Sequence, residues 1–376
     1  MMRAYKFRLY PNSNQTILIN KTLGSTRFVY NYYLSKKKDE YAKDKTKISC
    51  YECIKDLTSD LSKEKEWLKE VDSMSLRCAL FDLDDAYQRM FKQGSGYPKF
   101  KSKHNIKNSY RTNYTNDNIR LDLNNKIIRL PKLKDINIRG YRNISQINGR
   151  IINATISKEA NGKYYVSILV EEKDMIKEVT PQSIIGLDLG LKDIVVTSDG
   201  DKYKNEKTIT KYEHRIKLIQ RRLSKKVPRS NNYYKMKKRL AVLYKKLQNA
   251  RKNIIHHITK KIVKENDIIV AETLSIKNMT KNHNLSKSII DVTWYELIRQ
   301  IGYKSKCQGK KFYQIDTFYP SSQICSKCGH KNSEVKNLSV REWKCIECGN
   351  EVDRDINASI NIMFEGLKKY MQAVYA

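Results

Sequence analysis

The stretch ICSKCGHKNSEVKNLSVREWKCIECGNEVDRDINASIN, residues 324–361, holds two Cys-x-x-Cys pairs and, just after them, two alternating carboxylates. Two such pairs, with sixteen residues between them, can place four thiolates around one ion, and a full set of thiolates leaves no open position for chemistry. A glycine follows each pair, where a tight turn favours a residue without Cβ strain. We therefore predict a structural zinc site, with a redox dithiol as the alternative. Its ligands are Cys325, Cys328, Cys345 and Cys348.

The other cysteines do not form a second set of this kind. Cys50 and Cys53 make a lone Cys-x-x-Cys pair, and we predict that they pack inside a helix. Tight pairs at metal-ligand spacing are not typical of a secreted disulfide framework, and the first residues lack the apolar core of a signal peptide. No apolar run approaches the ~20 residues that span a membrane. We expect a soluble, cytoplasmic protein associated with the nucleoid and no membrane partner.

The chain is strongly basic. It has 376 residues, and 74 Lys and Arg against 40 Asp and Glu give a net charge of +34. A soluble chain of this charge most often binds nucleic acid, because Lys and Arg neutralise phosphates and release counterions. An anionic membrane surface is the rival partner. The length suggests two or three domains.

Two segments concentrate the positive charge. Residues 211–262 hold 18 Lys or Arg and a single acid, Glu213, on an apolar period that predicts a long helical hairpin. Residues 92–111 mix Lys and Arg with aromatic residues around one proline, which predicts a phosphate-contacting loop, with a solvated linker as the alternative. The candidate nucleic-acid contacts are Arg221, Arg222, Lys225 and Lys226 in the hairpin and Lys99 and Lys101 in the loop.

Hydrophobic periodicity predicts an α+β chain. Residues 2–9 alternate as a strand, residues 15–92 follow helical periods, and residues 110–172 return to strands, so a β domain with a helical insertion is the economical interpretation. Further elements are a strand–turn–strand over residues 183–197, a buried strand over 267–271, a helix around Trp294–Ile301 and a strand over 310–318.

Three acids stand at the ends of these elements. Asp188 ends one apolar strand, Glu272 follows another, and Asp355 lies where a helix begins. Carboxylates that converge repel one another unless cations hold them together. Hard oxygen ligands favour Mg²⁺, and a pair of such ions is a clamp for phosphodiester hydrolysis. Each acid alone is more simply a helix cap or a surface charge, but all three in a very basic chain favour a metal site.

The motifs "GLDLG", "VAETL" and "DRDINASINI", with the four-cysteine segment just before the last, resemble the RuvC-type nuclease motifs of the TnpB family. This is a family of transposon-associated proteins related to the type V CRISPR effectors. The segments "MRAYKFRLYPN", "FVYNYYL" and "GYPKFKSK" are similar to its N-terminal pattern, so the resemblance spans nearly the whole chain.

The resemblance implies an RNA-guided DNA endonuclease with Asp188, Glu272 and Asp355 as catalytic acids. Its cofactors are Mg²⁺, as two ions, and structural Zn²⁺; its partners are a guide RNA from the transposon end and a target double-stranded DNA. A short duplex motif beside the target is read by the N-terminal domains. Asp355 is preferred to Asp353 as the metal ligand. The rival functions are a nuclease-inactive RNA-guided repressor and a transposase or accessory DNA-binding protein.

The resemblance also implies an α+β multidomain architecture. An RNase H-like (RuvC) α/β core is expected over residues 181–320 and 351–376, with a zinc ribbon inserted at residues 321–350. A split β-barrel wedge domain is expected at residues 1–14 and 110–180, and a helical recognition domain at residues 15–109. The acids follow the zinc ligands so closely because the ribbon is inserted just before the last catalytic element.

Overall fold

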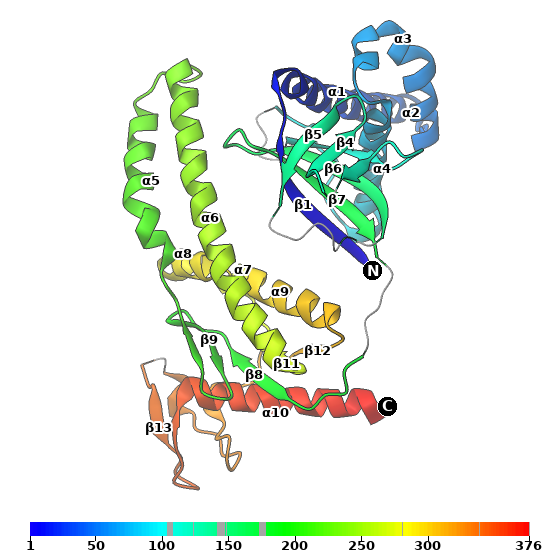
Figure 1. The fold of residues 1–376 in the computed structure, drawn as a ribbon. Helices are drawn as coiled ribbons and strands as arrows, with labels where there is room; N and C mark the ends of the chain where they lie inside the picture. The colour runs from blue at the N-terminus through cyan, green and yellow to red at the C-terminus, as the bar shows by residue number, and fades with distance from the viewer. Residues whose placement is uncertain are drawn as a thin grey trace. The chain divides into compact units, whose positions relative to one another are not determined.

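The chain folds as two compact units in a computed structural model. The structure describes residues 1–103, 108–122, 124–140, 147, 149–172, 178–279, 281–337 and 339–375. The first unit is Met1–Asp174 and the second is Met175–Ala376 (Figure 1). Each has a hydrophobic core of its own.

An antiparallel sheet of seven strands forms the base of the N-terminal unit. Along β7, side chains alternate between buried and partly exposed, as expected for a sheet with one face in a core. The strands are β1 (Met2–Tyr10), β2 (Asn108–Asn113), β3 (Arg120–Asp122), β4 (Ile127–Leu130), β5 (Lys134–Arg139), β6 (Arg150–Lys158) and β7 (Tyr164–Glu171), in the order β2-β6-β7-β1-β5-β4-β3. Strand β1 lies between β7 and β5, so the helices that follow β1 in sequence interrupt a single sheet. In the described residues β2 and β3 are the edges, and no pairing between them closes the sheet into a barrel.

The helical insertion lies between β1 and β2 in sequence. It comprises α1 (Ser13–Asp44), α2 (Cys50–Asp56), the π-helical η1 (Leu57–Leu61), α3 (Ser62–Glu64), the 3₁₀ turn η2 (Glu66–Glu70) and α4 (Ser73–Gln93). Side-chain caps fix where the long helices begin: Asn12 accepts from the Gln15 amide, and Asp72 accepts from the amides that follow it. Cys53 is buried in the core of this insertion, and burial raises the pKa of its thiol to about 11. This confirms that Cys50 and Cys53 pack within a helical block.

A mixed sheet of five strands organises the C-terminal unit. Its strands are β8 (Ile184–Asp188), β9 (Asp193–Thr197), β10 (Lys202–Lys204), β11 (Ile268–Ala271) and β12 (Lys311–Gln314), in the order β10-β9-β8-β11-β12. The first three in sequence form an antiparallel meander, whereas β11 runs parallel to both β8 and β12. The carboxyl ends of β8, β11 and β12 therefore meet at one edge of the sheet.

Helices cover both faces of this sheet. They are α5 (Thr208–Ser224), α6 (Asn231–Glu265), α7 (Ile276–Met279), α8 (His283–Val292), α9 (Trp294–Cys307) and α10 (Arg354–Tyr375). Because side chains alternate along a strand, Ile269 of β11 contacts the core that α6 and α9 share, whereas Val270 contacts the core that includes Ile362 of α10. Figure 1 shows α10 running along the sheet on the side opposite α6 and α9, and α5 and α6 projecting from it as an antiparallel pair.

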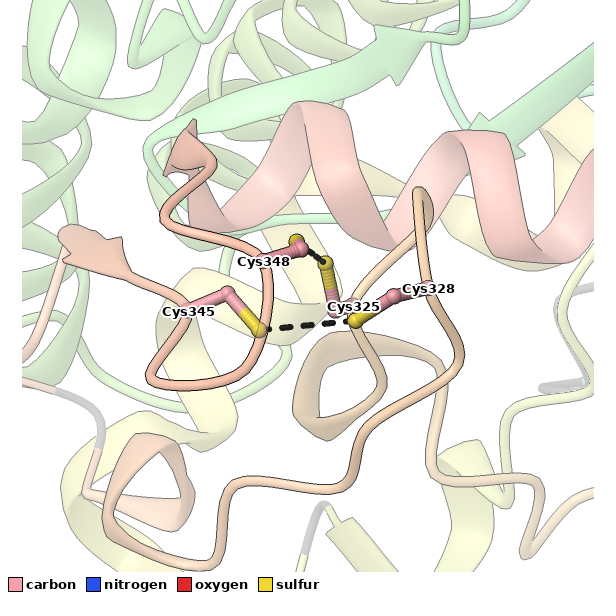
Figure 2. A group of neighbouring side chains, drawn as sticks. All are labelled: Cys325, Cys328, Cys345 and Cys348. Carbon is pink, nitrogen blue, oxygen red and sulfur yellow. Dashed lines mark hydrogen bonds between the residues drawn. The ribbon is translucent and has the colours of Figure 1, made fainter.

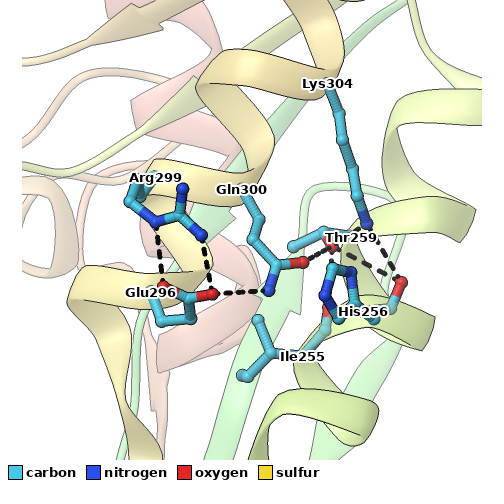
Figure 3. Close-up of polar contacts among 7 residues, drawn as sticks. All are labelled: Ile255, His256, Thr259, Glu296, Arg299, Gln300 and Lys304. Atoms are coloured by element: carbon cyan, nitrogen blue, oxygen red, sulfur yellow. Dashed lines mark hydrogen bonds and ion pairs between the residues drawn. The ribbon is translucent and has the colours of Figure 1, made fainter. Parts of the chain in front are cut away.

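A polar network with Thr259 and Gln300 buried at its centre holds α6 to α9 (Figure 3). Gln300 of α9 accepts a hydrogen bond from the Thr259 hydroxyl of α6 at 3.0 Å and donates to Glu296, which also receives two bonds from Arg299. Lys304 donates to Thr259 at 2.6 Å, and burial lowers the pKa of Lys304 to about 8. Buried polar groups that are satisfied in this way specify one packing arrangement.

Two glycines bring α10 unusually close to the sheet. A Cβ at Gly186 of β8 would lie 2.0 Å from the backbone oxygen of Ser359 in α10. A Cβ at Gly366 of α10 would lie 2.3 Å from the methyl carbons of Val270 in β11. Only hydrogen fits at these positions, so the two contacts fix where α10 sits on the sheet.

A small lobe precedes α10. It contains the 3₁₀ turns η4 (Ser321–Gln323) and η5 (Glu334–Lys336) and the two-stranded sheet of β13 (Glu342–Lys344) and β14 (Glu351–Asp353). Its core is little more than Val335, Trp343 and the cysteines. Strands β10, β13 and β14 were not predicted from the sequence, because three residues are too few to show a period.

Candidate active site and zinc ribbon

Asp188 and Glu272 lie side by side at the carboxyl edge of the mixed sheet. Asp188 ends β8, Glu272 directly follows β11, and the parallel register pairs Leu187 with Ala271, the residues just before them. The backbone amide of Leu189 donates a hydrogen bond of 3.0 Å to the Glu272 carboxylate. In sheets with parallel strands this edge is where ligands bind.

The electrostatics of the pair are those of acids crowded together. Burial raises the pKa of Asp188 well above its ordinary value, and the charges of Glu272 and Asp355 raise it further, whereas the Arg354 guanidinium opposes them. Burial also raises the pKa of Glu272 to about 7, against the bond from Leu189. Both carboxyls therefore hold protons more tightly than ordinary acids, as expected for groups that ionise fully only when a cation is bound.

Asp355 of α10 lies near enough for its charge to raise the pKa of Asp188, whereas the side chain of Asp353 bonds to the backbone at the start of α10. Asp355 lies in the first turn of α10, with the guanidinium of Arg341 3.4 Å from its carboxylate. Asp353 accepts the backbone amides of Asp355 and Ile356 at 3.0 and 3.1 Å, which is the bonding of a helix cap. Its other oxygen pairs with Lys202. The carboxylate of Asp353 is thus occupied, whereas that of Asp355 has a single arginine contact of marginal length.

The zinc ligands predicted from the sequence are together. The Sγ atoms of the four cysteines all lie within 4.8 Å of one another. In the part of the chain that the structure describes, no other group of three or more His, Cys, Asp or Glu side chains has its ligand atoms this close together. The three acids are farther apart than this. Figure 2 shows the cysteines converging from two loops beside α10, with 3.7 Å between Cys325 and Cys348 and 3.5 Å between Cys328 and Cys345.

The two loops that carry these cysteines have the same backbone. The amides of Gly329 and Gly349 donate to the carbonyls of Cys325 and Cys345, each at 2.9 Å. Both glycines have positive φ, 80° and 66°, which explains why glycine follows each pair. Backbone amides of Cys348 and Glu347 lower the pKa of the Cys345 thiol, whereas contact with the other three thiols raises the pKa of Cys328. Four thiolates in two such turns fit a structural zinc ion.

Helix α10 binds the first of these loops through two buried asparagines. Asn357 accepts the Ser326 amide at 2.8 Å and donates to the carbonyl of Ile324 at 2.6 Å. Asn361, one turn further on, donates to the carbonyls of Ile324 and Ser321. The cysteine lobe is therefore attached to the helix that carries Asp355. The sequence prediction missed these asparagines, although their spacing of four residues on one helix face was visible in "NASIN".

Most of the candidate nucleic-acid contacts are exposed, and one of them has partners within its own unit. Arg221 and Arg222 in the last turn of α5, and Lys225 and Lys226 just after it, are exposed, as is Lys99. Lys101 is engaged within its own unit: its ammonium lies 3.9 Å from the centre of the Tyr30 ring and 4.0 Å from Asp82. The structure thus gives Lys101 internal partners.

A groove in the N-terminal unit also escaped the sequence prediction. It lies between the helical insertion and strands β2 and β6, with a volume of about 610 Å³. Three arginines and several aromatic and amide side chains line it. They include Arg77, Arg111, Arg150, Tyr51, Phe81, Tyr114, Asn113 and Asn153. The lining residues come from segments far apart in sequence, so no local motif could have predicted the groove.

Three family profiles match successive parts of the chain. A profile described as "Helix-turn-helix domain" of OrfB_IS605 matches residues 1–46, one described as "Probable transposase" matches residues 167–283, and one described as "Cas12f1-like, TNB domain" matches residues 294–362. The last includes the four cysteines and Asp355.

Relatives match over nearly the whole chain. A Streptomyces pristinaespiralis protein whose name describes an RNA-guided DNA endonuclease is 30% identical over 366 residues, covering 97% of this chain and 89% of its own. InsQ of Escherichia coli K12, whose name describes the same activity, is 30% identical over 381 residues, covering 97% of this chain and 92% of its own.

Solved structures share the fold at low identity. Cas12f1, in a complex with sgRNA and target DNA, has a TM-score of 0.58 at 13% identity and covers 96% of this chain and 98% of its own. The RNA-guided endonuclease CRISPR-Cas_phi3 has a TM-score of 0.54 at 10% identity and covers 98% of this chain and 92% of its own.

Two relatives that are 30% identical over nearly the whole chain are named as RNA-guided DNA endonucleases, which places the chain in the nuclease class. The chain belongs to the transposon-associated TnpB family of RNA-guided DNA endonucleases. In the described part of the chain, no helix is both long and apolar enough to cross a membrane.

Proposed function

We propose that this protein is an RNA-guided, metal-dependent DNA endonuclease of the RuvC type, with Asp188, Glu272 and Asp355 as its catalytic acids. The observation that carries the proposal is the position of Asp188 beside Glu272 at the carboxyl ends of two parallel strands, with the charge of Asp355 acting on the same carboxyl. The antiparallel meander extended by two parallel strands supports an RNase H-like core.

The three carboxylates are suited to hold Mg²⁺. When bound, a pair of such ions would activate a water molecule and stabilise the leaving oxygen of the phosphodiester. Burial is the main cause of the raised pKa values of Asp188 and Glu272, and a bound cation would favour their ionised forms. Leu189 orients the Glu272 carboxylate through its amide, and Asp353 orients the first turn of α10, on which Asp355 stands.

The remaining features suit the guide and the target. The exposed Lys and Arg side chains of the α5–α6 hairpin offer a surface for the phosphate backbone of the guide RNA. The guide then selects the target by base pairing. The groove has the exposed side chains of Arg77 and Arg150 in its lining, and a guanidinium can donate two hydrogen bonds to a guanine edge in a duplex. We assign it the recognition of the short duplex motif beside the target.

Domain roles follow the expected boundaries. Residues 1–14 and 110–180 act as the wedge domain and residues 15–109 as the recognition domain; residues 181–320 and 351–376 form the nuclease core, with the zinc ribbon at residues 321–350. The observed asparagine contacts from α10 support a ribbon that helps to shape the active site.

The competing function is a nuclease-inactive, RNA-guided repressor. Asp188, Glu272 and Asp355 are all present, and a protein that only binds DNA has no need for crowded acids with raised pKa values. The test is to purify the protein with RNA expressed from its own locus and to incubate it with matched plasmid and Mg²⁺. Linear product from the wild type and none from Asp188→Ala supports the nuclease; intact plasmid with tight target binding by both supports the repressor.

A further inference from the structure

The end of α4 and the loop after it expose aromatic side chains within a basic stretch of sequence. Phe91 is 71% exposed, Tyr97 49% and Phe100 55%. From Arg89 to Lys103 the sequence RMFKQGSGYPKFKSK has five Lys or Arg and no acid. Large exposed rings are costly in water and mark contact sites.

The rings are ordered before any partner arrives. Tyr87 and Phe91, one turn apart on α4, are nearly parallel, with 6.4 Å between ring centres and 19° between planes. Gly94 ends the helix with a positive φ of 62°, and the chain turns back so that Tyr97 meets Tyr87 edge-on at 5.7 Å. The two hydroxyls are 3.0 Å apart. We call Tyr87, Phe91 and Tyr97 the aromatic platform.

The loop that completes the platform is clamped to α1. The Asn31 side chain donates to the Lys101 carbonyl at 2.9 Å and accepts its amide at 2.8 Å, as a neighbouring strand would. The Lys101 ammonium lies over the Tyr30 ring and near Asp82. This clamp accounts for the internal partners of Lys101, whereas Lys92, Lys99 and Lys103 of the same segment are exposed.

We propose that the aromatic platform stacks an unpaired base of the bound RNA, with Lys92 and Lys99 holding the adjoining phosphates. This inference rests on the proposed RNA-guided function. Aromatic side chains in a basic groove bind unpaired nucleotides through stacking and charge together. RNA is favoured over target DNA because a folded RNA presents unpaired bases in loops and bulges as soon as it binds, whereas a DNA strand becomes unpaired only after the guide has opened the target duplex.

The affinity test uses a 20-nucleotide oligouridine and a blunt DNA duplex of equal length. The variant Phe91→Ala/Tyr97→Ala should bind oligouridine roughly 5- to 150-fold more weakly, the range for loss of one stacked base. Its salt dependence should match the wild type, because no phosphate contact is lost. Phe91→Trp/Tyr97→Trp should retain affinity. The control Tyr41→Ala removes a ring of similar exposure, 48%, elsewhere in the same unit and should change nothing.

A second measurement needs no variant. Wild-type protein expressed with 4-thiouridine-labelled RNA is irradiated, and crosslinked peptides are identified by mass spectrometry. A crosslink within residues 87–103 is expected. Unchanged oligouridine affinity in the alanine variant, equal loss on the DNA duplex, or RNA crosslinks confined to other segments would each overturn the platform. None of these results bears on plasmid cleavage by the wild type, whose absence would instead contradict the proposed nuclease.

Discussion

Asn357 of α10 accepts a hydrogen bond from the backbone amide of Ser326 at 2.8 Å, two residues along the helix from Asp355. This bond, with those of Asn361, joins the first cysteine loop to the helix that carries a candidate catalytic acid. A lobe with so small a core depends on its metal to fold. Zinc binding and catalysis are therefore expected to be coupled.

The first prediction tests this coupling. Cys345→Ser should lower the zinc content from about one ion per chain, because it removes one of four thiolate ligands. It should also reduce cleavage, since the loop bound by Asn357 loses its order. Elemental analysis and a plasmid-cleavage assay provide the measurements. The matched control is Cys307→Ser, which removes a cysteine outside the cluster and should alter neither. Unchanged zinc in Cys345→Ser would refute the ligand assignment.

The second prediction separates the two acids at the start of α10. Asp355→Ala should abolish cleavage while target binding stays near the wild type, because its carboxylate is assigned to metal. Asp353→Ala should retain cleavage but destabilise the helix start by about 1 kcal/mol, the usual cost of losing a cap. Asp353→Asn keeps a capping oxygen and should recover most of that stability. An active Asp355→Ala beside an inactive Asp353→Ala would reverse the assignment.

The third prediction concerns the close packing of α10. Gly186→Ala should destabilise the C-terminal unit by at least about 1–3 kcal/mol, the usual cost of overpacking, because the new methyl meets the backbone of Ser359. Gly302→Ala is the control: its Cβ would have ordinary contacts with Phe312 in mid-helix, so a gain of roughly 0.5–1 kcal/mol is expected. Urea unfolding of both variants measures the difference. Equal stabilities would show that α10 is not held as tightly as the structure indicates.

The fourth prediction follows from the raised pKa of Glu272, about 7 against 4.5 for an ordinary glutamate. Between these values the folded state binds more protons than the unfolded state, so stability contributed by this group is present at low pH and is lost as pH rises toward 7. In EDTA, Glu272→Gln should therefore gain stability relative to the wild type as pH increases from about 5 to 7. Thermal unfolding across this range checks it. Parallel pH profiles for both proteins would contradict the assigned pKa.

The fifth prediction concerns the basic hairpin. Replacing Arg221, Arg222, Lys225 and Lys226 with glutamine should weaken RNA binding and flatten its salt dependence. If all four contact phosphates, the slope of log K against log salt should fall by about 3, at roughly 0.7 per contact on single strands. Filter binding at several salt concentrations gives the slope. An unaltered slope would mean that these residues form only a solvated face.

Much of the fold was predictable because its signals are local. The cysteine pairs gave the zinc lobe through their spacing, and the apolar runs around Asp188 and Glu272 gave two strand ends. Asp188 and Glu272 lie side by side only because β8 and β11 are neighbours in the sheet, and no local sequence pattern encodes that strand order. The groove around Arg77 and Arg111 joins distant segments and was invisible for the same reason. The internal partners of Lys101, Tyr30 and Asp82, lie far away in sequence and could not be predicted either.

The central claim is that a bound RNA directs the carboxylate site to its target. The most direct measurement supplies the purified protein with an RNA whose guide segment has been replaced and maps the cuts in duplex DNA carrying old and new targets. The account predicts Mg²⁺-dependent cuts only at the sequence that matches the new guide, and none with Asp188→Ala. Cuts that ignore the guide, or full cutting by protein free of RNA, would contradict it.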